Sequence, residues 1–278
     1  LIVGPWNHIS FWPWQGELNF GSSWGAAAVD FGPSLGSLTF DWLQAQLSGR
    51  EVAEELPVRI YTMGANQWRF EPAWPLERAK PTQLFLQAEG HAGDVPSTPA
   101  AEQSFTYDPA RPVPTLGGNT LLMHAPAGSF EQSRIESRDD VLVFTSSTLT
   151  EDVEVTGRVT AQLAVSTDAP TTDWVVRLCD VHPNGLSYNV MDGITRAVSE
   201  PGKRSLVEVD LWSTSMVFKK GHRLRVQVTS SSFPRWDRNL NMIDGFETGE
   251  MRAANQTVHL GGDSFLTLPV IPGEGEDS

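Results

Sequence analysis

The residues after Pro57 contain many short apolar or alternating segments bounded by turn-forming residues, and this pattern restricts the fold most. Segments of this kind predict β-strands, because alternation places one face of a strand in the core. The 40% hydrophobic residues, 24 Gly and 19 Pro suit many strands joined by turns. Eight such segments lie at 58–63, 83–86, 141–144, 153–156, 159–165, 174–181, 205–211 and 223–228. The chain is therefore predicted to be mainly β, with a two-sheet jelly-roll β-sandwich.

The first 56 residues show a different sequence pattern. The apolar run at residues 1–3, followed by Gly-Pro, predicts the end of a buried strand. Apolar residues at helical spacing before Gly49 predict a helix over 34–48 that packs on a sheet. The aromatic-rich loop 9–33 between them is expected to bury rings against a neighbouring domain or to line a pocket, with a carbohydrate-stacking surface as the alternative.

These sequence patterns divide the chain into three predicted regions. Residues 1–56 form the first unit and 57–271 the β-sandwich. Residues 272–278 form an acidic, Gly-rich tail that is expected to be disordered.

Charge and composition limit the partners. The formal net charge of −14 argues against nucleic acid and anionic membrane as partners, because phosphates require a basic face. No run of 18 apolar residues predicts a transmembrane helix, and the first residues lack the charged start of a signal peptide. The single cysteine, Cys179, lies in an apolar run and is expected to pack in the core, so the compartment stays undecided. The start at Leu1 indicates a fragment, and any targeting signal would lie upstream.

The sequence does not show the residue spacing that is typical of a metal site. The six histidines are dispersed, with no pair at helical or short-loop spacing, so no metal site and no cofactor are expected. The aspartates at 139–140 and 168–173 lack the glycine-marked loop of a calcium site and are interpreted as turn residues. The histidines are His8, His91, His124, His182, His222 and His259.

The motif Gly-x-Ser-x-Gly of an acyl-transfer serine does not occur in the sequence. Ser230 to Ser232 follow a predicted strand and lead into residues 233–239, which are rich in Arg and Asp. This loop is interpreted as structural, with its charged groups paired locally, and a role in domain docking is the alternative. His8 is a histidine at a strand end, which is more often a structural loop residue than a catalytic base when nothing else is considered.

Six ordered motifs carry a resemblance to a known family. Gly4 to His8, Met63 to Arg69, and the later stretches 107–118, 138–142, 180–194 and 221–239 occur in the family's order. On these motifs the chain resembles the cocaine esterase and X-prolyl dipeptidyl aminopeptidase family of serine hydrolases over nearly its whole length.

The resemblance implies an α/β-hydrolase domain with a cap, followed by a C-terminal jelly roll. Residues 1–56 then correspond to the last strand, histidine loop and closing helix of the hydrolase domain. His8 matches the triad histidine, and Leu122 and Met123 match a segment that reaches the acyl pocket. The implied activity is hydrolysis of acyl esters, α-amino acid esters or X-Pro peptides without a cofactor. The serine and the acid would lie upstream, so the chain alone is expected to be inactive, with the upstream hydrolase and cap domains as its partners.

Two other readings stay open. The chain could be a stand-alone jelly-roll binding module for a carbohydrate or a protein, without catalysis. It could also be an interaction domain that docks another subunit, and a homo-oligomer is possible. Residues 1–48 discriminate between the readings, because a free binding module has no use for a strand, a histidine loop and a helix that match a hydrolase terminus.

Overall fold

A computed structural model describes residues 1–8, 12–24, 35–50, 57–98, 100–121 and 127–273. The predicted helix 34–48 falls within the third of these ranges, apart from its first residue, Ser34. The predicted tail from residue 274 onward lies outside the described residues, as do Leu122 and Met123.

The N-terminal segment forms a small sheet together with the residues that follow Pro57. Strand β1 (Ile2–Val3) pairs in parallel with β4 (Val58–Thr62), and β4 pairs antiparallel with β5 (Gln67–Glu71). Strands β2 (Trp14–Gln15) and β3 (Leu18–Asn19) form a separate hairpin, followed by the 3₁₀ helix η1 (Ser22–Trp24). Residues on both sides of the predicted boundary at 56 and 57 therefore share one sheet.

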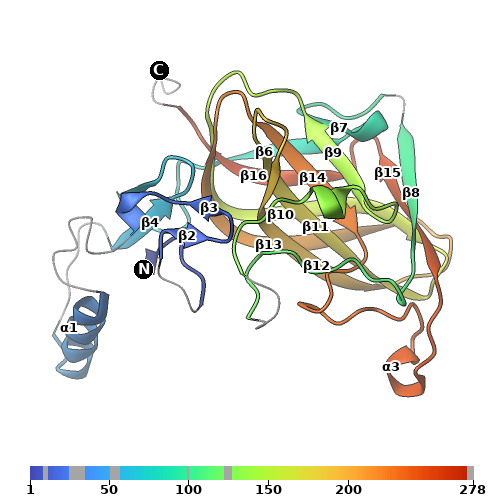
Figure 1. The fold of residues 1–278 in the computed structure, drawn as a ribbon, viewed down its shortest axis with the longest axis horizontal. Helices are drawn as coiled ribbons and strands as arrows, with labels where there is room; N and C mark the ends of the chain where they lie inside the picture. The colour runs from blue at the N-terminus through green and yellow to red at the C-terminus, as the bar shows by residue number, and fades with distance from the viewer. Residues whose placement is uncertain (9–11, 25–34, 51–56, 99, 122–126, 274–278) are drawn as a thin grey trace.

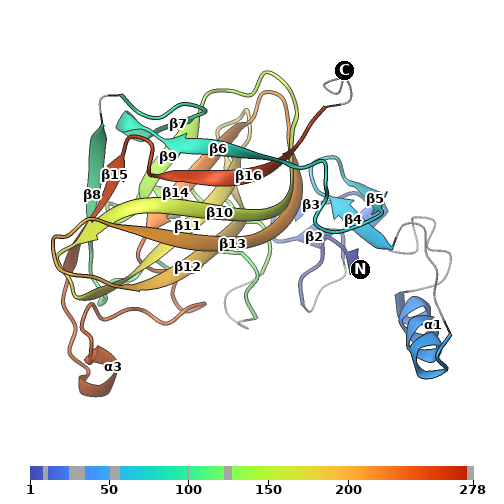
Figure 2. The same ribbon diagram turned by 180° about the vertical axis from the view of Figure 1, so that it is seen from behind.

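Helix α1 (Leu35–Leu47) lies where the sequence predicts a helix, and its packing on a sheet stays a prediction. In both views it stands to one side of the main body (Figures 1 and 2). Ala45 is buried and Leu38 contacts a small cluster of buried aromatic residues, whereas Phe40, Trp42 and Leu47 are exposed. The apolar side chains that predict an amphipathic helix are thus mostly uncovered in this chain.

The remaining elements build the β-sandwich and its connections. They are β6 (Lys80–Leu86), η3 (Ala88–Gly90), β7 (His91–Gly93), β8 (Ala101–Tyr107), α2 (Ser133–Glu136), β9 (Leu142–Ser146), β10 (Val153–Thr167), β11 (Thr171–Val181), β12 (Ser187–Val198), β13 (Ser205–Phe218), β14 (Arg223–Thr229), α3 (Gly245–Thr248), β15 (Ala254–Leu260) and β16 (Phe265–Ile271). None of the helices in the described parts of the chain is long and apolar enough to cross a membrane.

The strands form one 11-stranded sheet that folds over on itself. Its order is β12-β11-β14-β9-β7-β6-β16-β10-β15-β8, and β13 pairs with β10. Figures 1 and 2 show that β11, β12 and β14 form one layer and that β6, β10, β13 and β16 form the other. The predicted β-sandwich is confirmed.

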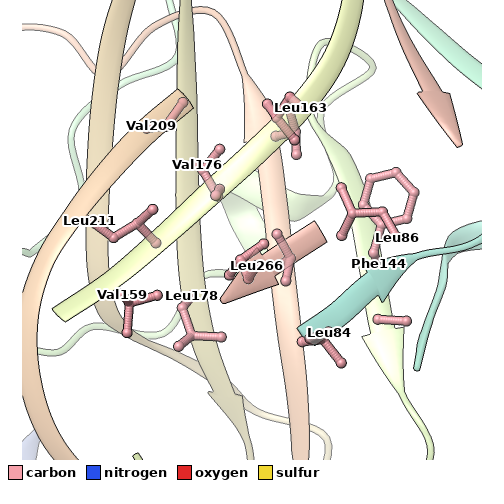
Figure 3. Close-up of a cluster of buried hydrophobic side chains, with 14 of the residues drawn as sticks. Leu84, Leu86, Phe144, Val159, Leu163, Val176, Leu178, Val209, Leu211 and Leu266 are labelled. Atoms are coloured by element: carbon pink, nitrogen blue, oxygen red, sulfur yellow. The ribbon is translucent and has the colours of Figure 1, made fainter. Parts of the chain in front are cut away.

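The core lies between these two layers. Leu163 of β10 and Leu211 of β13 point toward Val176 and Leu178 of β11, with Leu266 of β16 beside them (Figure 3). All five side chains are buried. Burial of apolar surface between two twisted sheets is the main favourable free-energy term of such a fold.

One pair of predicted strands is a single strand. Residues 153–156 and 159–165 both belong to β10, which has 15 residues. Gly157 has a positive φ of 141°, and the register with β13 shifts between Arg158 and Thr160. Such a β-bulge bends a strand without ending it, so the break in the apolar pattern around Gly157 does not end the strand.

Candidate active site

A cavity of about 510 Å³ lies where the N-terminal segment meets the β-sandwich. Residues from the small sheet and from two long strands of the sandwich line it, so it joins segments far apart in the sequence. The lining includes residues 3–8, 60–61, 118–121, 128–129, 189–192 and 211–215. A cavity of this size is typical of a small-molecule site.

His8 lies on the loop that follows β1, and it is one of the residues that line this cavity. Its side chain is exposed. The loop is held by the buried side chain of Gln15, whose Oε1 accepts hydrogen bonds from Asn7 Nδ2 at 2.7 Å and from Asn7 N at 3.2 Å. Gln15 Nε2 in turn donates to the carbonyl oxygen of Trp12 at 2.8 Å. These hydrogen bonds tether the loop that carries an exposed imidazole to the rim of the cavity.

An aromatic cluster fixes the residues just before His8. The ring of Trp6 packs on Trp68 with centroids 5.6 Å apart, and Tyr61 meets Trp68 edge-on at 5.5 Å. The Trp68 indole donates to the carbonyl oxygen of Ser23 at 2.9 Å, and the Tyr61 hydroxyl donates to that of Phe20. Burial raises the pKa of Tyr61, which keeps this hydroxyl a donor.

The aromatic loop 9–33 was expected to bury its rings or to line a pocket, and its described residues divide between two environments. Phe20 is buried and lines the cavity, whereas Trp12 and Trp14 are exposed. Phe11 and Phe31 lie outside the described residues.

Gly128 and Ser129, on a loop of the β-sandwich, also line the cavity. The backbone of Ser129 contacts the backbone of the β2–β3 hairpin. Ser129 N donates to the carbonyl oxygen of Gln15 at 3.1 Å, and Glu17 N donates to that of Ser129 at 2.7 Å. Gly118 and Gly128 exchange backbone hydrogen bonds of 2.8 and 3.0 Å. These contacts fasten the histidine-bearing segment to the sandwich.

Gly128 is required for this contact, and we expect Gly128→Ala to separate the two segments. Its φ is 116°, and an added Cβ would lie 2.5 Å from the carbonyl carbon of Gln15. The positive φ alone costs an alanine about 1–3 kcal/mol, and the backbone clash adds to that cost. Thermal unfolding of the intact protein, followed by circular dichroism, should show a lower midpoint.

Gly262→Ala is the matched control for this substitution. Gly262 has a similar φ of 113°, but an added Cβ would lie 3.6 Å from Pro96, which is ordinary contact. If both variants lose the same free energy of unfolding, the clash between the added Cβ at position 128 and the backbone of Gln15 does not contribute to the loss.

A buried ion-pair group lies at the side of the cavity formed by β12. Asp192 accepts a hydrogen bond from Arg235 Nη1, and its other carboxylate oxygen lies 3.5 Å from Arg177 Nη2. Arg177 and Asp192 expose only 2% and 7% of their side chains. Arg177 Nη1 also donates to Gln227 Oε1 at 2.6 Å, and Arg235 lies 4.0 Å above the ring of Trp236. The group carries one negative and two positive charges, so its carboxylate is fully engaged.

The structure places the other predicted residues as follows. Leu121, the neighbour of Leu122 and Met123, lines the cavity and is 69% exposed.

Cys179 is buried, and burial raises the pKa of its thiol, so it is not a nucleophile. The expectation that residues 233–239 pair locally is wrong for Arg235, which pairs with Asp192 of β12, 43 positions earlier in the chain.

Sequence spacing also missed a pair of histidines. His182 and His222 come from different turns, yet their ring centroids lie 4.5 Å apart, and both rings face Asp180. The expectation of no metal site rested on separation along the chain, and the fold removes that separation for these two residues.

Residues 51–267 match the family described as the X-Pro dipeptidyl-peptidase C-terminal non-catalytic domain, and the chain belongs to this family. The resemblance to cocaine esterase and X-prolyl peptidase relatives, predicted from the six motifs, is confirmed.

Individual relatives agree with this family. The chain is 35% identical to the cocaine esterase of Rhodococcus sp. (strain MB1 Bresler) over 98% of its own length and 51% of that protein. It superposes on a solved α-amino acid ester hydrolase with a TM-score of 0.81 and 30% identity, covering 96% of this chain and 49% of that one. An aminopeptidase from a Thaumarchaeota archaeon gives a TM-score of 0.79 and 28% identity over 94% and 47% of the two chains. The chain thus spans about half the length of these relatives.

Proposed function

We propose that this chain supplies the triad histidine and one wall of the substrate pocket of a serine hydrolase that cleaves esters or amides. The observation that carries the proposal is the exposed side chain of His8 at the 510 Å³ cavity, on a loop that directly follows a parallel strand. In α/β-hydrolases the nucleophile and the acid precede the histidine in the chain. Both would therefore come from residues upstream of Leu1.

In this mechanism His8 removes the proton of the serine hydroxyl as the oxygen attacks the substrate carbonyl. The resulting imidazolium then donates that proton to the leaving alcohol or amine, which leaves an acyl-enzyme. In the second half His8 takes a proton from water, and the hydroxide attacks the acyl-enzyme. The imidazolium of His8 then returns that proton to the serine oxygen as the acyl–serine bond breaks, which releases the carboxylic acid and regenerates the enzyme.

The exposed apolar side chains of the N-terminal segment support an upstream domain as the partner. Leu1 and Val3 of the β1 edge and Phe40, Trp42 and Leu47 of α1 are all exposed. Apolar surface of this extent usually marks a contact with another protein or domain. The half of the matched relatives that this chain does not cover is long enough to hold such a domain.

The chemistry of the cavity wall favours a neutral acyl group. Among the described residues that line it, Asp192 is the only carboxylate, and Arg177 and Arg235 already engage it. The α-ammonium group of an amino acid ester needs an unpaired carboxylate, which this wall does not offer. Exposed apolar groups such as Leu121 and Trp212 instead present surface to an uncharged acyl chain.

Steady-state kinetics on the intact protein test this proposal at two levels. We expect labelling of a serine by a fluorophosphonate probe, and a kcat/KM for p-nitrophenyl acetate at least about tenfold above that for the p-nitrophenyl ester of alanine. No labelling and no turnover of either ester would contradict the hydrolase. A preference for the alanine ester would leave the hydrolase standing and refute the neutral acyl group.

A further inference from the structure

We infer that Asp180, His182 and His222 form a binding site for one divalent transition-metal ion, with Zn²⁺ as the best match. The three side chains each offer one ligand atom, and these atoms all lie within 4.8 Å of one another. None of the three lines the cavity around His8, so the site is separate from the proposed active site. The inference does not depend on the proposed function.

The distances suit a single ion. His222 Nδ1 lies 2.9 and 3.0 Å from the two carboxylate oxygens of Asp180, and His182 Nε2 lies 3.3 Å from Asp180 Oδ2. Zinc binds nitrogen and oxygen ligands at about 2.0–2.2 Å, so two ligands of a tetrahedral ion are roughly 3.3 Å apart. The separations of both histidines from Asp180 lie within a few tenths of an ångström of this value, and all three ligand atoms lie within 4.8 Å of one another.

The donor set determines the class of ion. Two imidazole nitrogens and one carboxylate oxygen suit zinc, copper, nickel or cobalt, whereas magnesium and calcium prefer oxygen ligands throughout. Three protein ligands leave a fourth position for water. The carboxylate also brings one negative charge that partly balances the two charges of the ion.

The backbone holds the three residues in place. Asp180 lies on β11, opposite Tyr188 of β12 and Leu224 of β14. His182 lies in the turn after β11, where its N–H donates to Leu186 O at 2.8 Å. His222 lies in the turn before β14, where its N–H donates to the carbonyl oxygen of Lys219 at 2.9 Å. Ligands fixed on strands and tight turns lose little conformational entropy when an ion binds.

Exposure gives an ion a route into the site. The side chain of Asp180 is only 3% exposed, whereas His182 and His222 are 29% and 15% exposed. The ring of His182 also packs against Tyr188, with centroids 4.9 Å apart, which orients the imidazole. The carboxylate thus forms the floor, and the two imidazoles form the open side through which solvent reaches it.

The test is metal titration of the intact protein after treatment with a chelator. We expect one equivalent of Zn²⁺ by isothermal titration calorimetry, a visible spectrum of four- or five-coordinate Co²⁺, and a melting midpoint several degrees higher with Zn²⁺ but not with Mg²⁺. His182→Gln and His222→Gln should each weaken Zn²⁺ binding at this site by at least about 100-fold, since even outer-shell changes cost 10–100-fold. His91→Gln, at an exposed histidine on β7, should bind Zn²⁺ as the unchanged protein does.

Two results would overturn the site. One is a wild-type protein that binds no Zn²⁺ at millimolar concentration, and the other is unchanged binding in the variant that carries both substitutions. If a variant fails to fold in the presence of chelator, X-ray absorption on the Zn²⁺-loaded wild type decides the matter. Two imidazole ligands are expected there, and any other number contradicts the proposal.

Discussion

Replacing His8 with alanine in the intact protein should lower kcat for p-nitrophenyl acetate by about 10⁴- to 10⁶-fold. Without the imidazole, no group accepts the serine proton during attack, and none protonates the leaving group. The substrate still meets the same cavity wall, so KM should change little. The measurement is steady-state hydrolysis with active-site titration, which separates slow turnover from a small fraction of active protein.

The controls for His8→Ala address the fold and the chemistry separately. The side chain of His8 is exposed, so its removal changes little buried apolar surface. The melting midpoint should therefore stay within a few degrees of the wild-type value. His91→Ala removes another exposed histidine outside the cavity and should keep full activity. Free imidazole should restore part of the activity of His8→Ala. A variant that keeps more than a tenth of the wild-type kcat would show that His8 is not the triad base.

The strands of the sandwich were largely predictable because half-buried strands show their alternation in the sequence. The alternating segment 205–211 belongs to β13, whereas the segment 174–181 belongs to β11, which is buried at every position and is predictable from its mostly apolar sequence instead. The polar and glycine-containing sequence of β12 hides its strand character, since Asp192 and Gly193 interrupt the alternation. Gly193 is needed there because an added Cβ would lie 2.0 Å from the carbonyl oxygen of Asp210. Packing of β12 on β13 therefore overrides the local pattern.

The position of His8 after a short strand could be predicted from its motif, but the residues around it could not. Gln15 looks like an ordinary polar loop residue, and only the fold shows that it is buried and holds Asn7. The bond between Asp192 and Arg235 spans 43 positions, so local reasoning had no means to find it. Strand pairing across the sheet brings such partners together, and the sequence shows only that charged residues occur in apolar surroundings.

The Asp192→Asn substitution tests the largest of these hidden interactions. We expect it to destabilise the β-sandwich by about 3–5 kcal/mol, because Arg177 would then be buried without a counter-charge. For a domain of this size that loss lowers the melting midpoint by roughly 10 °C. Arg235 would also lose its carboxylate partner beside the cavity, so kcat/KM for the neutral ester should fall as well.

Asp263→Asn is the matched control, because it makes the same chemical change in the pair with Arg204, whose two side chains are both more than half exposed. Exposed pairs contribute about 0–1 kcal/mol, so its midpoint should hardly move. Replacing Arg177 by Leu in the Asp192→Asn background should recover part of the lost stability, since it removes the uncompensated charge. If Asp192→Asn melts no lower than Asp263→Asn, the buried group does not stabilise the wall.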